Sequence, residues 1–249
     1  MARRATVIKQ ERSQADYLLL LDAGNAWLND RNPAKLSRGK SSVEVMNKLG
    51  YDAMALGLQD LILKPEEVAQ RIKEARFSVL SANAYWKGGV ELVGLPYVIF
   101  EMGGHRVGVL GLTAQGVREG FEIVSPTEAA RAWLPKLQCE ADIVVVLSNA
   151  GPEVDRELLR RFQGIDILIS GAGQRLLQPE AVPSGALLFS ADVSRPGFAG
   201  ERVGVAQLSF DREGKLIGYS WRRVVITPEF AADPEIKAWV ESVKGKVDW

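Results

Sequence analysis

Short continuous apolar runs alternate with amphipathic segments over the first two thirds of the chain. The apolar runs span residues 17–23, 52–57, 77–83, 142–149 and 166–171. Runs of this length without polar alternation are typical of strands buried on both faces. Segments with helical spacing or helix-start residues span residues 2–14, 43–49, 65–75, 126–138 and 152–163. Strands that alternate with helices in this way favour an α/β layered sandwich with the helices outside.

Glycine and proline set the bounds of several predicted helices. Gly50 and Gly164 follow the last positions of two helices, where glycine commonly ends a helix. Pro65 and Pro152 stand in first turns, where the missing N–H would have no helical partner. Pro135 stands inside another predicted helix, and we expect it to kink that helix or to end it early.

The pattern becomes mostly β toward the end of the chain. A hairpin is predicted earlier, where Gly103 and Gly104 separate two apolar runs at residues 97–102 and 106–112. Further strands are predicted at residues 186–192, 202–210 and 215–226, with a turn at 211–214 and a closing helix at 233–246. The sequence shows no internal repeat and no linker before about residue 227.

The composition excludes several classes of site. The 249 residues include 31 Lys and Arg against 31 Asp and Glu, so no net charge favours binding to nucleic acid. The single cysteine, Cys139, excludes an internal disulfide and a thiolate zinc cluster. The single histidine, His105, excludes a multi-histidine metal site within one chain, and it falls in the predicted hairpin turn. No apolar run is long enough to span a membrane, and no export signal is visible, so the chain as written would stay in the cytoplasm.

Polar residues follow four of the predicted strands. In an α/β sheet, ligands bind beyond the carboxyl ends of the strands, so these loops are the candidate site. They span residues 22–25, 57–60, 148–151 and 171–174.

The order and spacing of these segments resemble the metal-dependent 5′-nucleotidase branch of the metallophosphoesterase superfamily. The resemblance runs from about Ala2 to Pro228. It is carried by residues 3–10, 17–24, 49–57, 80–83, 108–113, 144–148, 155–171 and 203–211. It implies a four-layer αββα sandwich, two metal ions between the sheets and hydrolysis of phosphate esters. It also implies a domain at residues 1–228, followed at 229–249 by a tail helix that is the remnant of a linker to an absent nucleotide-binding domain.

The ligand motifs of that family depart from their pattern in this chain. An aspartate that would bridge the metals is replaced by Asn25, after Asp22-Ala23-Gly24. An asparagine ligand and the neighbouring histidine are replaced by Leu58 and Gln59, while Asp60 keeps its position. The aspartate that would partner that histidine falls on Ile62.

The later motifs and the first one are altered as well. The family's Ser-His is Ser148-Asn149 here, and its Gly-His-x-His is Gly171-Ala172-Gly173-Gln174. The family's first motif, an Asp-x-His on the first strand, has no counterpart, because the sequence begins at the helix that follows that strand. The fold is therefore expected to lack its usual first strand. Neutral amides and leucine are poor ligands for Zn²⁺ or Mn²⁺.

We therefore expect no catalytic residues, no metal ligands and no cofactor. What remains is a vestigial site pocket, formed by Asn25, Leu58, Gln59, Asp60, Asn149, Ala172 and Gln174. Its polar groups either hydrogen-bond the loops to one another or line a pocket for a small polar ligand, and the first interpretation is favoured because buried polar groups need partners.

Three hypotheses for the function follow. The favoured one is a catalytically inactive 5′-nucleotidase-like protein that acts as a binding or scaffolding module. The alternative is a hydrolase, a metal-dependent phosphoesterase with an altered metal site. The third is that the sequence is a piece of a longer protein. Because a missing strand would leave an open sheet edge, self-association or a protein partner is expected to cover it. Members of the family are often periplasmic or extracellular, so the compartment is left open.

Overall fold

Side chains of the central strands alternate between two apolar cores. In β8 (Ile143–Ser148), Val145 and Leu147 face a core between two sheets, whereas Val144 and Val146 face a core under two helices. This period-2 alternation, with both faces apolar, is what a strand buried on both sides requires. The computed structural model that shows this arrangement describes residues 1–28, 32–173, 176–191 and 201–244.

Two sheets form the middle layers. The first is parallel and has the order β1-β2-β3, with bounds β1 (Leu21–Asp22), β2 (Ala53–Ala55) and β3 (Ser78–Leu80). The second has the order β10-β11-β9-β8-β6-β5. Its further strands are β5 (Tyr97–Met102), β6 (His105–Leu112), β9 (Ile167–Ser170), β10 (Glu180–Ala181) and β11 (Leu187–Phe189). The pairs of β6, β8, β9 and β11 are parallel, and the outer strands β5 and β10 are antiparallel to their neighbours.

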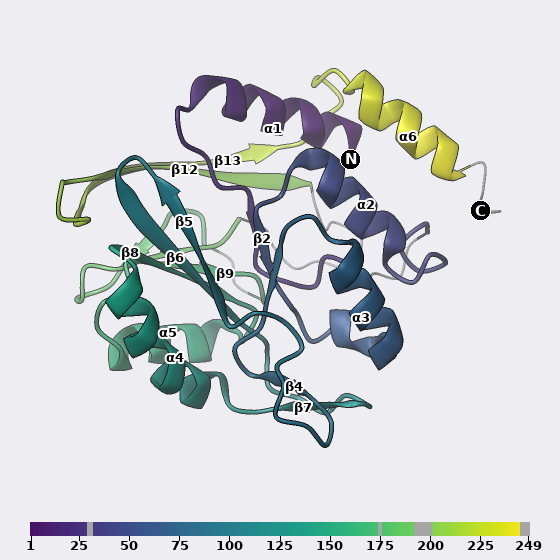
Figure 1. Cartoon of the computed structure of the whole chain (residues 1–249). Helices are drawn as coiled ribbons and strands as arrows, with labels where there is room; N and C mark the ends of the chain where they lie inside the picture. The colour runs from purple at the N-terminus through teal and green to yellow at the C-terminus, as the bar shows by residue number, and fades with distance from the viewer. Residues whose placement is uncertain (29–31, 174–175, 192–200, 245–249) are drawn as a thin grey trace.

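Helices cover the outer face of each sheet, which gives the four αββα layers (Figure 1). The first sheet is covered by α1 (Ala2–Gln14), α2 (Lys40–Leu49) and α3 (Pro65–Glu74). The second is covered by α4 (Pro126–Glu140) and α5 (Pro152–Arg161). A short 3₁₀ turn, η1 (Asp60–Ile62), follows β2. The α/β sandwich expected from the pattern is therefore confirmed. Among the described residues, no helix has the length and apolar character that crossing a bilayer requires.

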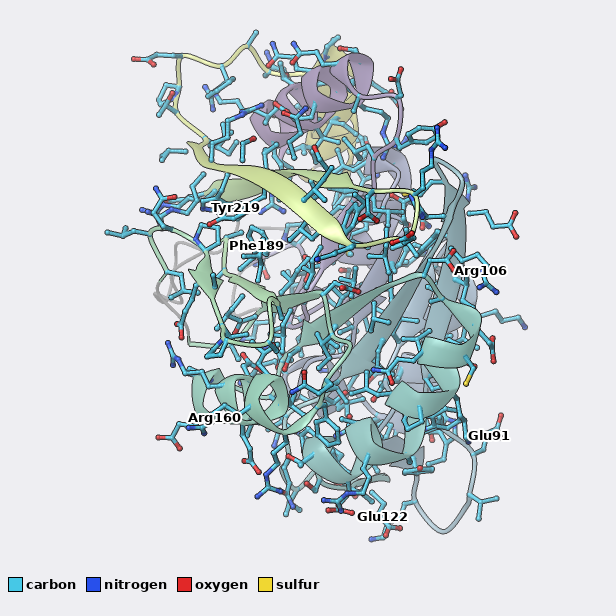
Figure 2. The ribbon with its side chains drawn as sticks, turned by 90° about the vertical axis from the view of Figure 1, so that its left-hand side faces the viewer. Glu91, Arg106, Glu122, Arg160, Phe189 and Tyr219 are labelled. Atoms are coloured by element: carbon cyan, nitrogen blue, oxygen red, sulfur yellow. The ribbon has the colours of Figure 1, made fainter. Side chains whose placement is uncertain are left out.

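Two ribbons complete the fold. The long hairpin of β12 (Arg202–Phe210) and β13 (Leu216–Val225) packs against the core between the sheets. Phe189 of β11 meets Tyr219 and Trp221 of the ribbon at ring-centroid distances of 6.5 and 5.1 Å, and Figure 2 shows Tyr219 above Phe189. A small antiparallel pair, β4 (Ala84–Trp86) with β7 (Phe121–Ile123), lies at the other end of the molecule (Figure 1).

The last helix, α6 (Pro234–Lys244), lies beside α1. Lys9 forms an ion pair with Asp233 at 2.7 Å, and the Thr6 hydroxyl donates to the Ala231 carbonyl at 2.7 Å. Ile236 is fully buried in the core under α1 and α2. The expected tail helix is thus part of this packing, while the division of the chain at residue 228 stays a prediction.

Several local expectations need correction. Pro135 does not end α4 early, because the helix continues through Glu140. The apolar run 17–23 pairs as a strand only over Leu21–Asp22. Helix α5 is capped at Phe162, ahead of the glycine expected in that role. The expected strand 186–192 is described as β11, and its last position lies outside the described residues. The short strands β4, β7 and β10 were not predicted.

The two sheets approach each other closely at a glycine. A Cβ added to Gly111 in β6 would lie 2.4 Å from the Cβ of Leu80 in β3 and 2.8 Å from its carbonyl oxygen. These atoms belong to a buried strand end and cannot move aside cheaply, because interiors are close-packed. The absence of a side chain at position 111 therefore sets the spacing of the sheets at this point.

We predict that Gly111→Ala lowers the free energy of unfolding by about 1–3 kcal/mol through overpacking. Gly218→Ala is the matched control, because Gly218 also lies in a strand and a Cβ there meets nothing within 4 Å. That control is expected to change stability by less than about 0.5 kcal/mol. Urea unfolding of both variants is the measurement, and equal stabilities would contradict the close approach of the sheets.

Candidate functional site

The four loops at the strand ends come together in space. We call residues 22–25, 57–60, 148–151 and 171–173 the four-loop cluster. A Cβ added to Gly57 would lie 2.1 Å from Asn25 Oδ1, and one added to Gly171 would lie 2.2 Å from the Ala23 carbonyl oxygen. Such distances require glycine, so the glycines that end these strands allow the loops to touch.

Asp60 holds two of the loops together. Its carboxylate is fully buried and accepts N–H groups from Asn25, Trp27 and Gly57, each at 2.9 Å. Burial raises the pKa of Asp60 from 3.8 to about 6, and the backbone N–H donors act in the opposite direction. Both carboxylate oxygens are therefore engaged with the backbone.

Asn25 has an unusual backbone conformation for a residue with a side chain. Its φ is +62°, in the left-handed region that asparagine tolerates better than most residues. In this conformation its Oδ1 accepts the N–H of Gln59 at 2.9 Å. The side chain of Gln59 itself is exposed.

Asn149 joins the third loop to the first two. It is 1% exposed, its Nδ2 donates to the Ala23 carbonyl at 3.1 Å, and its Oδ1 accepts the N–H of Leu58 at 3.4 Å. The side-chain amide of Asn149 thus donates to one neighbouring loop and accepts from another.

Leu58 faces a further loop. A Cβ added to Gly116 would lie 2.7 Å from Cδ2 of Leu58, and Arg118 Nε donates to the Leu58 carbonyl at 2.8 Å. Ala172 is half-buried, Ile62 on η1 is 49% exposed, and Gln174 lies outside the described residues. His105 begins β6, whereas the cluster lies beyond the other end of that strand, so the histidine does not join the site.

A second buried carboxylate was not predicted from the sequence. Asp155, in the first turn of α5, is fully buried and accepts the hydroxyls of Ser148 and Ser170. These serines are paired across β8 and β9. Burial raises the pKa of Asp155 from 3.8 to about 6, although the two hydroxyls act in the opposite direction. The serines that end two neighbouring strands, followed by an acid in a first helical turn, were the available signal.

Comparisons with known proteins agree with this architecture. No protein-family model matches the sequence. The chain is 28% identical over 280 residues to the snake venom 5′-nucleotidase of Crotalus adamanteus, covering 98% of this chain and 46% of that protein. The chain thus spans about half the length of the curated relatives it matches.

Solved structures show the same fold. The 5′-nucleotidase precursor from Thermus thermophilus superimposes with a TM-score of 0.85 at 28% identity, covering 98% of this chain and 52% of that one. The calcineurin-like phosphoesterase YfkN from Bacillus subtilis has a TM-score of 0.77 at 21% identity, covering 99% and 88%. This is the metallophosphoesterase fold, in its 5′-nucleotidase form. The resemblance found in the sequence is confirmed at that level.

The donors of this metallophosphoesterase-fold chain do not fit the two metal ions that the resemblance implies. The side-chain oxygens of Asp60, Asn25 and Asn149 all accept backbone N–H groups. The side chain of Leu58 has no atom that can bind a metal ion. Within the described ranges, no group of three or more His, Cys, Asp or Glu side chains is arranged to hold a metal ion. Divalent metals in such sites need carboxylate or imidazole ligands that are free to coordinate.

We predict that Asn149→Ala lowers the free energy of unfolding by about 1–3 kcal/mol, because it leaves two partly buried backbone groups without partners. Gln59→Ala removes another polar side chain of the same cluster, but an exposed one. It is expected to change stability by less than about 0.5 kcal/mol. Thermal or urea unfolding measures both, and a neutral Asn149→Ala would show that the amide does not join the loops.

The raised pKa of Asp155 predicts that the stability of the fold depends on pH. Its pKa is raised in the folded state, so between about pH 4 and 6 the folded chain retains a proton that the unfolded chain has lost. The free energy of unfolding contributed by this group therefore falls as pH rises through that window, by about 3 kcal/mol at most. Asp155→Asn should remove that slope.

The measurement is urea unfolding between pH 4 and 7. Asp16→Asn, at an exposed position, should keep the wild-type profile. Because Asp60 also has a raised pKa, the informative quantity is the difference between wild type and each variant. Identical profiles for wild type and Asp155→Asn would refute the assignment of the slope to Asp155.

Proposed function

We propose that this chain does not hydrolyse phosphate esters and acts as a binding or scaffolding module on a metallophosphoesterase fold. One observation carries the proposal: the side-chain oxygens and nitrogens of the four-loop cluster are hydrogen-bonded to the backbone of its own loops. Asp60 alone accepts three backbone N–H groups, and Asn149 connects Ala23 to Leu58. A site that hydrolyses phosphate esters with two metals needs those atoms for the ions.

The proposal depends only on positions inside the sequence. Asn25, Leu58 and Asn149 occupy three positions at which the resemblance implies metal ligands or catalytic groups. The polar groups of the cluster then hold the loops in place, which was the favoured interpretation of the vestigial site.

The alternative function is a metal-dependent phosphoesterase with an altered metal site. It is favoured by the 28% identity to proteins named as 5′-nucleotidases over nearly the whole chain. The two functions differ in whether the protein holds metal tightly, so metal content separates them directly.

We predict a metal content close to zero after loading. The purified chain is stripped with a chelator, incubated with Mn²⁺ and Zn²⁺, separated from excess metal, and measured by elemental analysis. A metal-dependent phosphoesterase is carried through the same steps as a positive control. About one or two ions held per chain would overturn the proposal, and hydrolysis of a chromogenic phosphate ester would then be measured.

A protein partner or a second copy of the chain is proposed at the edge of the first sheet. In the order β1-β2-β3, β1 is the edge strand among the described residues. The other side of the sheet differs, because Ser81 N–H and the Leu95 carbonyl pair at 2.8 Å beside β3. An unpaired strand edge is a template for pairing with another chain, so β1 is where such a partner would add.

A further inference from the structure

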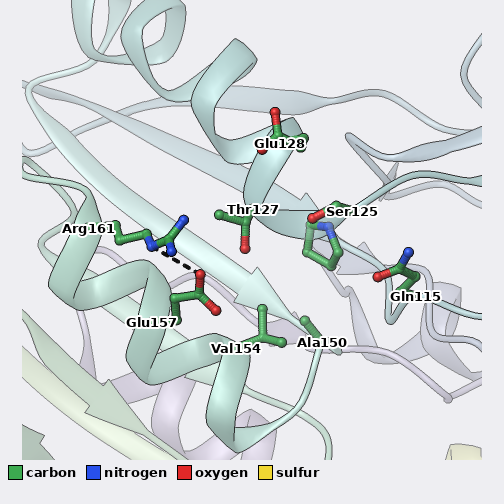
Figure 3. A pocket seen from close by; sticks show the side chains of 9 residues that line it. Gln115, Ser125, Thr127, Glu128, Ala150, Val154, Glu157 and Arg161 are labelled. Carbon is green, nitrogen blue, oxygen red and sulfur yellow. Dashed lines mark ion pairs between the residues drawn. The ribbon is translucent and has the colours of Figure 1, made fainter.

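A cavity of about 340 Å³ lies between α4 and α5, beside the four-loop cluster, with which it shares Ala150 (Figure 3). Its walls are the first turn of α4, one face of α5 and two loop residues. The lining residues are Gln115, Ser125, Pro126, Thr127, Glu128, Ala150, Val154, Glu157 and Arg161. We call this cavity the α4–α5 pocket. Cavities that hold small molecules begin at about this size.

The first turn of α4 presents hydrogen-bond donors to the α4–α5 pocket. Pro126 has no N–H, and the first backbone bond of the helix runs from Ala129 N–H to the Ser125 carbonyl at 3.0 Å. The N–H groups of Thr127 and Glu128 therefore have no acceptor within the helix. The N-cap residue Ser125 makes no side-chain cap. Such an N-terminus carries partial positive charge.

Thr127 supplies a second and independent observation. The residue is only 8% exposed, yet its hydroxyl has no hydrogen-bond partner in the described part of the chain. Figure 3 shows this hydroxyl pointing away from α4 into the space between the two helices. The hydroxyl oxygen itself reaches the open space of the pocket, so a group that occupies the pocket can accept a hydrogen bond from it.

The opposite wall carries an ion pair. Val154, Glu157 and Arg161 lie on one face of α5, and Arg161 Nε pairs with Glu157 Oε1 at 3.0 Å (Figure 3). This pair offsets the charge of Glu157, and the Arg161 guanidinium has further N–H groups that can donate. The other acid of the lining, Glu128 on α4, pairs with Arg131 at 2.7 Å. Each acid of the lining is therefore paired with an arginine, and Thr127 and Arg161 offer donors to the pocket.

We propose that the α4–α5 pocket binds a small molecule through an oxyanion, a phosphate or carboxylate group. The N–H groups of Thr127 and Glu128 and the hydroxyl of Thr127 donate to its oxygens from one side. The Arg161 guanidinium pairs with it from the other side. Hydrogen bonds of this charge-assisted kind are the strong ones in proteins. The site shares only Ala150 with the four-loop cluster, and none of its proposed donors belongs to that cluster.

The test uses inorganic phosphate and acetate as separate probes, titrated into the full chain in a chloride buffer. Amide resonances of a ¹⁵N-labelled sample report the location, and calorimetry reports the affinity. Saturable shifts are expected at Thr127 and Glu128. Glu66 and Glu67, in the first turn of α3, are the internal control, because that helix also begins with proline but does not line the pocket.

Two matched pairs of variants test the residues. Thr127→Val should weaken binding about tenfold, and Thr127→Ser should restore it to within about twofold, because only the hydroxyl is exchanged. Arg161→Gln should also weaken binding about tenfold. Arg160→Gln removes the same charge from an exposed neighbour on α5 that does not line the pocket, and it should leave binding within about twofold of wild type.

Binding of either probe with this pattern supports the proposal, and the stronger probe identifies the oxyanion. No saturable binding of phosphate or acetate up to about 10 mM would overturn it. Equal weakening by Arg160→Gln and Arg161→Gln would overturn it too, since binding would then reflect general surface charge. Shifts centred on Leu58 and Asn149 would overturn it as well, because the anion would then lie in the four-loop cluster.

Discussion

A single buried carboxylate organises the candidate site. Asp60 accepts three backbone N–H groups from the loops that follow β1 and β2, and it is enclosed away from solvent. In a low-dielectric interior, each of those N–H groups would be costly without an acceptor. Asn25 and Asn149 add the remaining ties, so the loops are held by hydrogen bonds within the chain. In this metallophosphoesterase fold, the loops at the strand ends are thus tied to one another by hydrogen bonds.

Much of the architecture follows from local pattern. The run 142–149 was predicted as a strand because it is apolar on both faces, and β8 is buried on both faces. The Gly103-Gly104 turn was predicted from two glycines, and both adopt positive φ. Pro135 was a poor guide to the end of α4, because that helix tolerates it while packing on the second sheet. The pair of β4 and β7 was missed because three-residue strands have no periodicity of their own and depend on tertiary pairing.

The chemistry of the site was less predictable than the fold. That four loops meet followed from strand order, but which atoms satisfy one another depends on distances of a few tenths of an ångström. Asp155 illustrates this, because two serines at strand ends and an acid at a helix start are a signal in the sequence, but they do not show that the carboxylate lies between Ser148 and Ser170. The α4–α5 pocket is a similar case, since Thr127 acquires its significance only when α5 is placed opposite it. A fold of this kind fixes where chemistry would occur, and the side chains decide what occurs there.

The contact of α1 with α6 bears on the order in which the chain acquires its structure. Lys9 and Asp233 are separated by 224 residues, and Ile236 enters the same core as Ala5 and Ile8. During synthesis, α1 leaves the ribosome long before the helix that covers it has been made. Until α6 has been made, the apolar side of α1 lacks this part of its packing, whereas the βαβ units of the second sheet form from contacts that are closer in sequence. The contact that joins the two ends of the described chain is thus among its least local ones.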